Sequence, residues 1–207
     1  MIKISTSLLS STDRIESIKQ LNKTSTDYIH IDVMDNKFVP NYQMPLDEVN
    51  KLSKYSKKNF DIHLMMKDPE TFINNINIPN LDSITIHIEI KKDIKKIIQL
   101  IKKKNCLVGI AIKPKTDINC LDNYLDEVDK VLVMSVEPGF GKQKFIEETT
   151  NRIVEIKKKN NKVPIEVDGG INNESINKIK EIADIAVSGS YITSSINYEE
   201  AINNLKN

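Results

Sequence analysis

The run Tyr28-Ile29-His30-Ile31-Asp32-Val33 is short and rich in β-branched residues, a pattern typical of a β-strand. Seven similar runs lie along the rest of the chain: Ile2 to Ser7, Phe60 to Met65, Ser83 to Ile88, Leu107 to Ile112, Lys130 to Val136, Val163 to Val167 and Ile185 to Ser188. The sequence of 207 residues therefore predicts eight strands.

Segments with helical spacing of apolar residues separate these runs. In the clearest one, Ile94, Ile97, Ile98 and Ile101 recur at intervals that mark one face of a helix. The other segments carry Ile15, Ile18 and Leu21; Val49 and Leu52; Phe72, Ile73 and Ile76; Ile153 and Ile156; Ile176, Ile179 and Ile182; and Ala201, Ile202 and Leu205. Helix-start signals precede three of them, at Thr12-Asp13, Asp68-Pro69-Glu70 and Asn172-Asn173-Glu174.

Strands that alternate with helices indicate a parallel sheet with right-handed crossovers. An open doubly wound sheet and a closed barrel both fit this pattern. The segment Asn119 to Asp129, between the fifth and sixth strands, has room for only about two helical turns. The count of eight nevertheless favours the α/β class and a (β/α)8 TIM barrel of minimal size, a parallel eight-stranded barrel with outer helices. No linker divides the chain, so we expect residues 1–207 to form a single barrel domain.

The composition bears on the partners of the protein. Thirty Lys and Arg against 29 Asp and Glu leave a net charge of +1, and only Arg14 and Arg152 are arginines, so we expect no nucleic-acid and no membrane partner. No window approaches the ~20 apolar residues that span a bilayer, and the first residues do not form a signal peptide. Cys106 and Cys120 have no metal-site or disulfide-framework spacing, which fits a reducing cytoplasm.

Polar residues recur at every second position near the ends of three predicted strands. His30 and Asp32 share one face of the second strand, His63 lies on the third, and His87 and Glu89 lie on the fourth. Alternate residues of a barrel strand point inward, and catalytic groups gather at the carboxyl ends of the strands. All three histidines of the chain thus occupy equivalent places, which favours a functional role over a packing role.

Two imidazoles and two carboxylates would meet in such a barrel. They belong to His30, Asp32, His63 and, at the end of the seventh strand, Asp168. This set suits Zn²⁺, Fe²⁺ or Mn²⁺, and the spacing alone does not choose among these ions. The alternative is a buried ion-pair network made by the same groups.

Glycine is scarce in this chain, so its placement is informative. Five of the six glycines lie in the last three strand-to-helix loops: Gly139, Gly141, Gly169, Gly170 and Gly189. Loops after the seventh and eighth strands of such barrels commonly bind phosphate, and glycine lets the backbone approach the anion closely. The three loops together predict a phosphate site, with ordinary turns as the alternative.

Other strand-end residues are weaker candidates. Met34, Met65 and Met134 are predicted to line the floor under a ligand, although methionine also serves as core filler. Ser7 ends the first strand and is a candidate to hydrogen-bond substrate, the alternative being a bond to local backbone.

Longer motifs carry a resemblance that extends from the first strand to the last. They are His30 to Asn41, Asp61 to Met65, Val133 to Gly141 and Glu166 to Gly170, joined by Gly109 to Pro114 and Val187 to Ser190. In these co-linear motifs the sequence resembles the ribulose-phosphate 3-epimerase family. The resemblance implies a barrel enzyme of the isomerase class that interconverts D-ribulose 5-phosphate and D-xylulose 5-phosphate in the pentose phosphate pathway.

The resemblance also implies site residues and partners. His30, Asp32, His63 and Asp168 match the metal ligands, which would hold one divalent ion per subunit, Zn²⁺ preferred, with Fe²⁺, Mn²⁺ or Co²⁺ as other options. Asp32 and Asp168 match the acid/base pair for two-base proton transfer at C3 through an enediolate. The residues that match or adjoin the substrate contacts are Ser7, His63, Gly139, Phe140, Gly141, Lys142, Asp168, Gly169, Gly170, Gly189 and Ser190. The expected partners are a phosphorylated ketopentose and further copies of the chain, as a dimer or hexamer.

The sequence departs from the family pattern at a few positions. Asn36 and Lys142 stand where glycine is usual, Thr6 replaces a proline, and Lys115 replaces a turn glycine. Asparagine tolerates positive φ, so the change at Asn36 is mild. Lys142 places a side chain beside the predicted phosphate loop, where it either adds a cation or points to solvent.

The predicted acids suit the implied reaction. Inversion of a carbon next to a ketone requires removing a proton from one face and returning one to the other, which two carboxylates on opposite walls can do. Three other functions stay open: an epimerase for a ketohexose phosphate such as allulose 6-phosphate, a decarboxylase of the wider phosphate-binding barrels, and a non-catalytic sugar-phosphate sensor. A decarboxylase would show an Asp-x-Lys-x-x-Asp strand, which is absent, and the presence of all four candidate ligands favours catalysis over a sensor.

Overall fold

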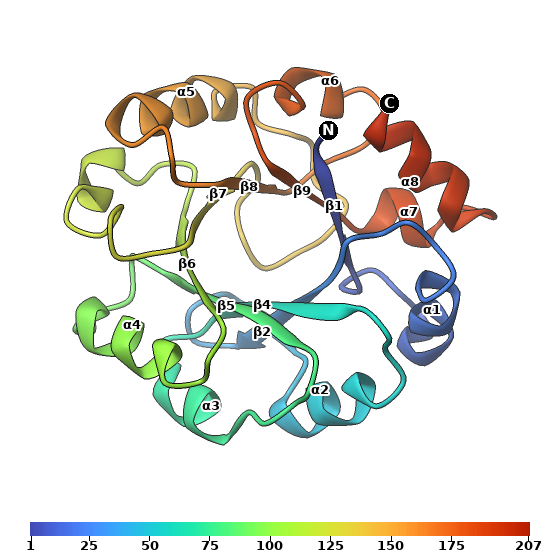
Figure 1. Cartoon of the computed structure of the whole chain (residues 1–207), viewed down its shortest axis with the longest axis horizontal. Helices are drawn as coiled ribbons and strands as arrows, with labels where there is room; N and C mark the ends of the chain where they lie inside the picture. The colour runs from blue at the N-terminus through green and yellow to red at the C-terminus, as the bar shows by residue number, and fades with distance from the viewer.

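The computed structural model describes residues 1–207 and contains a closed barrel of eight parallel strands (Figure 1). The barrel strands are β1 (Lys3–Ser7), β2 (Tyr28–Asp35), β4 (Asn59–Met65), β5 (Leu81–His87), β6 (Leu107–Ile112), β7 (Lys130–Met134), β8 (Ile165–Asp168) and β9 (Ile185–Ser188). β1 pairs in parallel with both β2 and β9, which closes the ring. The predicted TIM barrel is therefore confirmed, and the open sheet is excluded.

One short strand lies outside the barrel. β3 (Tyr42–Gln43) pairs antiparallel with the end of β2, opposite Met34 and Asp35. This pairing extends β2 two residues beyond its predicted end at Val33. β7, in contrast, ends at Met134 rather than Val136, and β8 begins at Ile165, directly after Pro164, which has no N–H to donate to a ladder.

Helices surround the barrel on the outside (Figure 1). They are α1 (Arg14–Leu21), α2 (Leu46–Ser53), α3 (Glu70–Asn75), α4 (Ile94–Lys102), α5 (Thr149–Lys159), α6 (Ile176–Ile179), α7 (Ser190–Thr193) and α8 (Tyr198–Lys206). The two turns expected between the fifth and sixth strands reduce to one 3₁₀ turn, η1 (Ile118–Leu121). Its Asp117 side chain accepts a hydrogen bond from the Asn119 N–H, a local bond that competes with a longer helix.

Helix α4 shows how the sequence specifies these outer elements. Its N-cap residue, Asp93, accepts a hydrogen bond from the Lys96 N–H, and Lys102 lies in its last turn, where a cation is favoured by the helix dipole. The buried face consists of Ile94, Ile97, Ile98 and Ile101. Burying an isoleucine contributes roughly 2 kcal/mol, so this face, rather than helix propensity, fixes the helix on the barrel.

The other predicted helix starts differ in detail. Asp13 caps α1 by accepting from the Glu16 N–H, as expected. The residue before α3 is Pro69, which makes no side-chain cap. Asn172 caps the turn that precedes α6. Its Oδ1 accepts hydrogen bonds from the N–H groups of Glu174 and Ser175.

The apolar core lies mainly between the barrel and the helices, while much of the barrel interior is polar. Ser5, Asp61, Ser83, Thr85, Lys130 and Glu166 are all buried there. A smaller apolar group, Ala111, Leu132, Met134, Val136 and Val187, lies apart from the main core. The structure has no helix with the length and apolar character needed to cross a membrane.

Candidate active site

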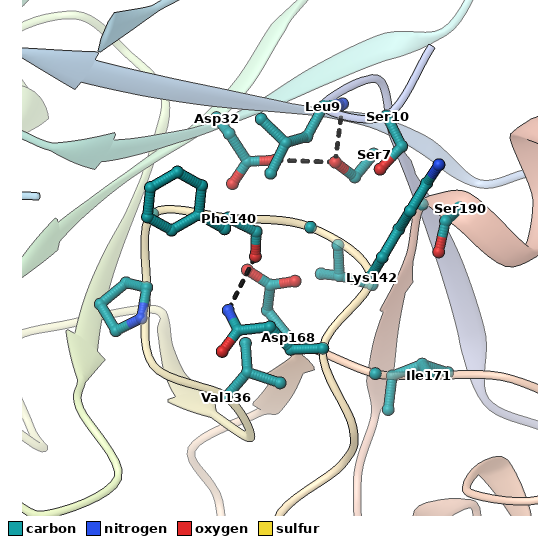
Figure 2. A pocket seen from close by; sticks show the side chains of 18 of the residues that line it. Ser7, Leu9, Ser10, Asp32, Val136, Phe140, Lys142, Asp168, Ile171 and Ser190 are labelled. Atoms are coloured by element: carbon teal, nitrogen blue, oxygen red, sulfur yellow. Dashed lines mark hydrogen bonds between the residues drawn. The ribbon is translucent and has the colours of Figure 1, made fainter. Parts of the chain in front are cut away.

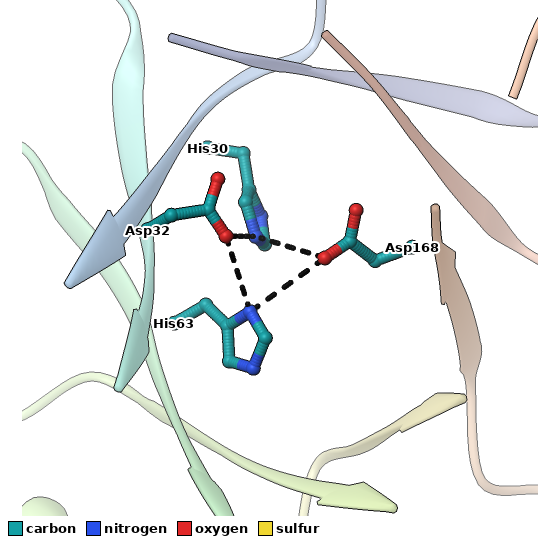
Figure 3. Close-up of side chains that lie close together, drawn as sticks. All are labelled: His30, Asp32, His63 and Asp168. Carbon is teal, nitrogen blue, oxygen red and sulfur yellow. Dashed lines mark ion pairs between the residues drawn. The ribbon is translucent and has the colours of Figure 1, made fainter. Parts of the chain in front are cut away.

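Four side chains converge inside the barrel at the carboxyl ends of three strands (Figure 3). His30 and Asp32 come from β2, His63 from β4 and Asp168 from the last position of β8. Asp32 and His63 are register partners on adjacent strands, whereas β8 is separated from β2 by β1 and β9. The arrangement therefore sets Asp168 across the barrel from Asp32.

The distances between these groups suit a single ion. Asp32 Oδ1 lies 3.5 Å from His30 Nε2 and 3.4 Å from His63 Nδ1. Asp168 Oδ2 lies 3.9 Å from His30 Nε2 and 3.7 Å from His63 Nδ1. All four ligand atoms lie within 4.8 Å of one another. The cluster could hold one metal ion.

The histidine nitrogens provide an independent test of that fit. His30 Nδ1 is bonded to Asp61 Oδ2 at 2.8 Å, and His63 Nε2 is bonded to His87 Nε2 at 2.9 Å. The opposite nitrogens, His30 Nε2 and His63 Nδ1, are buried and have no hydrogen-bond partner. Buried nitrogens without a partner are costly, and both point at the carboxylates of Asp32 and Asp168, so the donor set fits a divalent cation.

Burial and mutual charge shift the pKa values of the four groups. Burial, reinforced by the negative charge of Asp32, raises the pKa of Asp168 to about 7. Burial also opposes the ionisation of Asp32, but His30 and His63 outweigh it and hold the pKa of Asp32 well below its usual value. Burial lowers the pKa of His63 to about 4. The two carboxyl groups thus differ strongly in their affinity for a proton.

A buried ammonium group lies behind His30. Lys130 Nζ is 2.6 Å from Asp61 Oδ1 and 2.6 Å from Glu166 Oε2. Burial raises the pKa of Glu166 to about 8, with repulsion from Asp61 acting in the same direction. His30, Asp61 and Glu166 form a second group with metal-ligand geometry, but the lysine supplies the positive charge there. The candidate metal site is therefore the cluster of His30, Asp32, His63 and Asp168.

A cavity of about 440 Å³ opens above Asp32 and Asp168 (Figure 2). Every residue predicted to contact substrate lines it except His63, which is fully buried beneath. These lining residues are Ser7, Gly139, Phe140, Gly141, Lys142, Asp168, Gly169, Gly170, Gly189 and Ser190. The structure thus brings the ends of the first, sixth, seventh and eighth barrel strands to one pocket, together with Met34, Met65 and Met134.

Ser7 links the cavity wall to the carboxylate pair. Its hydroxyl donates to Asp32 Oδ2 at 2.7 Å and accepts from the Leu9 N–H at 3.1 Å. Both partners are drawn in Figure 2. For Ser7 the bond to local backbone, given above as the alternative to a substrate contact, is therefore present, and a second bond orients Asp32.

Two glycines of the seventh-strand loop are required by space as well as by φ. Gly169 has φ +122°, and a Cβ there would lie 2.4 Å from Val136 Cγ2. Gly170 has φ +65°, and its Cβ would lie 2.5 Å from the backbone N of Phe145. Any side chain would force this loop open and change the cavity wall.

The departures from the family pattern have clear local structures. Asn36 has φ 56°, as asparagine allows, and Lys142 has φ 61° at the exposed rim of the cavity. Thr6 is buried, and its hydroxyl bonds to that of Thr26 at 2.8 Å. Lys115 is 90% exposed and lies 3.8 Å from Glu137, away from the four clustered side chains.

Several residues around the site were not predicted from the sequence. Asp61, Lys130 and Glu166 carry the network behind His30. His87 and Glu89 were expected as strand-end polar residues, but the contact of His87 with His63 was not. The period-two pattern that found His63 also includes Asp61, and Glu166 lies two residues before Asp168, so alternation carried a signal for two of them. Further cavity residues outside the prediction are Leu9, Ser10, Val136, Pro138, Gln143, Ile171, Asn172, Val187, Tyr191 and Ser194.

Several solved enzyme structures have the same fold as this chain. The 3-hexulose-6-phosphate synthase from Salmonella typhimurium superposes with a TM-score of 0.69 at 17% identity, over 99% of this chain and 97% of that one. KGPDC from Streptococcus mutans gives a TM-score of 0.72 at 13% identity, over 100% and 96%. At these identities the likeness supports the fold alone.

Sequence relatives are more specific. A ribulose-phosphate 3-epimerase of Buchnera aphidicola subsp. Baizongia pistaciae is 38% identical over 92% of this chain and 87% of its own. That of Bacillus subtilis (strain 168) is 34% identical over 100% and 99%. The profile of the "Ribulose-phosphate 3 epimerase family" matches residues 3–193. With its barrel, its clustered ligands and these relatives, the chain belongs to the ribulose-phosphate 3-epimerase family.

Proposed function

We propose that this protein is a metal-dependent isomerase that interconverts D-ribulose 5-phosphate and D-xylulose 5-phosphate in the pentose phosphate pathway. The observation that carries the proposal is the pair Asp32 and Asp168, which come from non-adjacent strands and both line the one cavity above the histidines. The sequence relatives, named as ribulose-phosphate 3-epimerases, support the same reaction.

The two carboxyl groups divide the proton transfer between them. One takes the C3 proton from one face of the sugar, and the other returns a proton to the opposite face. Their roles exchange when the reaction runs in reverse. The bond from Ser7 holds Asp32 Oδ2, so that carboxylate keeps its orientation while its other oxygen faces the histidines.

The residues that would hold the metal are His30, Asp32, His63 and Asp168. Zn²⁺ is our preferred ion for this mixed nitrogen and oxygen set, and Fe²⁺, Mn²⁺ or Co²⁺ are the alternatives. When bound, the ion supplies positive charge that stabilises the negative charge developing on the substrate oxygens. The two nitrogens without hydrogen-bond partners support this assignment.

The three glycine loops form the proposed phosphate side of the cavity. Gly139, Gly141, Gly169, Gly170 and Gly189 of these loops line the pocket, together with the exposed Lys142. The phosphate bound there would fix C3 between Asp32 and Asp168, so that remote binding energy contributes to positioning.

A coupled assay tests this function. We expect the purified protein to epimerise ribulose 5-phosphate, to lose most of its turnover after chelation, and to regain it when Zn²⁺ or Mn²⁺ is added. Preference for allulose 6-phosphate would identify a ketohexose-phosphate epimerase instead. No turnover of either compound by the metal-loaded protein would refute the proposal.

Two further properties follow from the family resemblance. We propose that the protein is a homo-oligomer, a dimer or hexamer, which light scattering after size-exclusion chromatography measures directly. We also propose that it acts in the cytoplasm, and its free thiols at Cys106 and Cys120 support a reducing compartment.

A further inference from the structure

Three side chains, those of His63, His87 and Glu89, form a hydrogen-bonded row that begins at the candidate metal cluster. His63 Nε2 lies 2.9 Å from His87 Nε2, and His87 Nδ1 lies 3.0 Å from Glu89 Oε2. Both imidazoles are fully buried. The far end of the row is thus a carboxylate, and the near end is the nitrogen His63 Nδ1 that faces Asp32 and Asp168.

The other oxygen of Glu89 is already committed. Glu89 Oε1 accepts hydrogen bonds from the Lys113 N–H at 2.7 Å and from the Thr116 hydroxyl at 2.6 Å. These bonds hold the carboxylate against the loop after β6. Because an ionised carboxylate only accepts, Glu89 Oε2 requires that His87 Nδ1 carry a hydrogen.

The hydrogen on His87 Nδ1 also determines which nitrogen of His63 carries a hydrogen. A neutral His87 then has a lone pair on Nε2, which can only accept. The 2.9 Å contact therefore requires His63 to donate from its own Nε2. A neutral His63 protonated at Nε2 has its lone pair on Nδ1, pointing into the metal cluster, as a ligand must.

We propose that Glu89 and His87 are positioning residues that fix the tautomer of His63, so that Nδ1 presents a lone pair to the metal site. This inference deepens the proposed function, since it concerns the cation that the epimerase would use. The proposed effect passes through His87 and ends at Glu89, whose side chain does not line the cavity.

His30 provides an internal comparison. Its Nδ1 is held directly by Asp61, on the other side of the cluster, with no contact to His87 or Glu89. Separate carboxylates thus orient the two candidate imidazole ligands, Asp61 for His30 and Glu89, through His87, for His63. A change at Glu89 should alter the tautomer of His63 and leave the protonation of His30 unchanged.

The substitution Glu89→Gln reverses the donor pattern of this row. The Lys113 N–H needs an acceptor, so the amide oxygen takes the place of Oε1, and the amide NH₂ faces His87 Nδ1. His87 must then carry its hydrogen on Nε2 and donate to His63 Nε2. His63 is left with a hydrogen on Nδ1, directed at the metal site.

Nitrogen NMR of histidine-labelled protein measures this directly, because the chain contains only three histidines. In metal-free wild-type protein we expect His63 protonated at Nε2 and His87 at Nδ1. In Glu89→Gln we expect both to be reversed and the Zn²⁺ affinity, measured against a competing chelator, to fall about 10- to 100-fold. Thr116→Val is the matched control, since it removes a bond to Glu89 on the side away from His87; it should leave both tautomers and the affinity nearly unchanged.

The outcomes separate this inference from the proposed function. A wild-type spectrum with the His63 hydrogen on Nδ1 would overturn the inference even if the Glu89 variant failed to fold. Unchanged tautomers and Zn²⁺ affinity in a folded Glu89→Gln protein would also overturn it. If Glu89→Gln reverses the tautomers but the metal-loaded wild-type protein does not epimerise ribulose 5-phosphate, the proposed function is refuted and the positioning role stays supported.

Discussion

Replacing Lys130 by Met tests the charge network behind His30. Lys130 is 4% exposed, and its ammonium lies 2.6 Å from a carboxyl oxygen of both Asp61 and Glu166. Methionine has a similar length but no charge, so the substitution leaves the carboxylate of Asp61 buried without its cation. Removing one partner of a buried ion pair costs about 3–5 kcal/mol.

That cost translates into a clear thermal shift. A domain of this length loses about 2–4 °C for each kcal/mol, so Lys130→Met should lower Tm by about 10 °C. The measurement is thermal unfolding by circular dichroism at pH 7, with chelator present so that metal binding does not contribute.

A double-mutant cycle identifies the source of the loss. Asp61→Asn removes the ionised carboxylate that contacts Lys130, so Lys130→Met should cost at least about 1 kcal/mol less in that background. A Tm decrease below about 2 °C for Lys130→Met, or additive effects of the two substitutions, would show that the lysine does not stabilise this network.

Three other predictions concern the site and the surface. Asp168→Asn should lower kcat roughly 10²- to 10⁴-fold at full metal occupancy, verified by metal analysis; near-normal epimerisation would refute the two-carboxylate assignment. Lys142→Gly should raise KM for ribulose 5-phosphate severalfold with a smaller effect on kcat, because it removes a cation at the cavity rim, and an unchanged KM would place Lys142 outside the binding site. Burial raises the pKa of Cys106 to about 11, so its alkylation by iodoacetamide at pH 8 should be roughly 100-fold slower than that of an unperturbed thiol. The alkylation rate should rise steadily with pH up to 10, and a rate that levels off below pH 9 would contradict this.

The barrel and its central cluster were predictable because they depend on periodicity. Strand runs and the alternation of His30 with Asp32 are properties of consecutive residues, and parallel strands bring their carboxyl ends together whatever the loops do. His63 follows from the same alternation on the third strand, and Asp168 from its place at the end of the seventh. The sequence therefore indicated which side chains meet without any knowledge of the distances.

The parts that were not predictable depend on contacts between distant elements. Lys130 opens its strand, where a lysine ordinarily reaches solvent, and only the closed barrel shows that its ammonium extends inward to Asp61 and Glu166. His87 and Glu89 were recognised as strand-end polar residues, but the contact to His63 depends on the position of the adjacent strand. The single 3₁₀ turn at Ile118–Leu121 likewise reflects local bonds that helical spacing does not report.

The closure of the ring through β1 has a consequence for how an ion is captured. Asp32 and His63 are locked at one height by their paired strands, and Asp168 is tied to them through β9 and β1. One strand cannot slide without moving its neighbours all the way round the circumference, so the ligand atoms are spaced before any ion arrives. Insertions in the outer connections would then change access to the centre without altering its dimensions, which leaves those connections free to diverge.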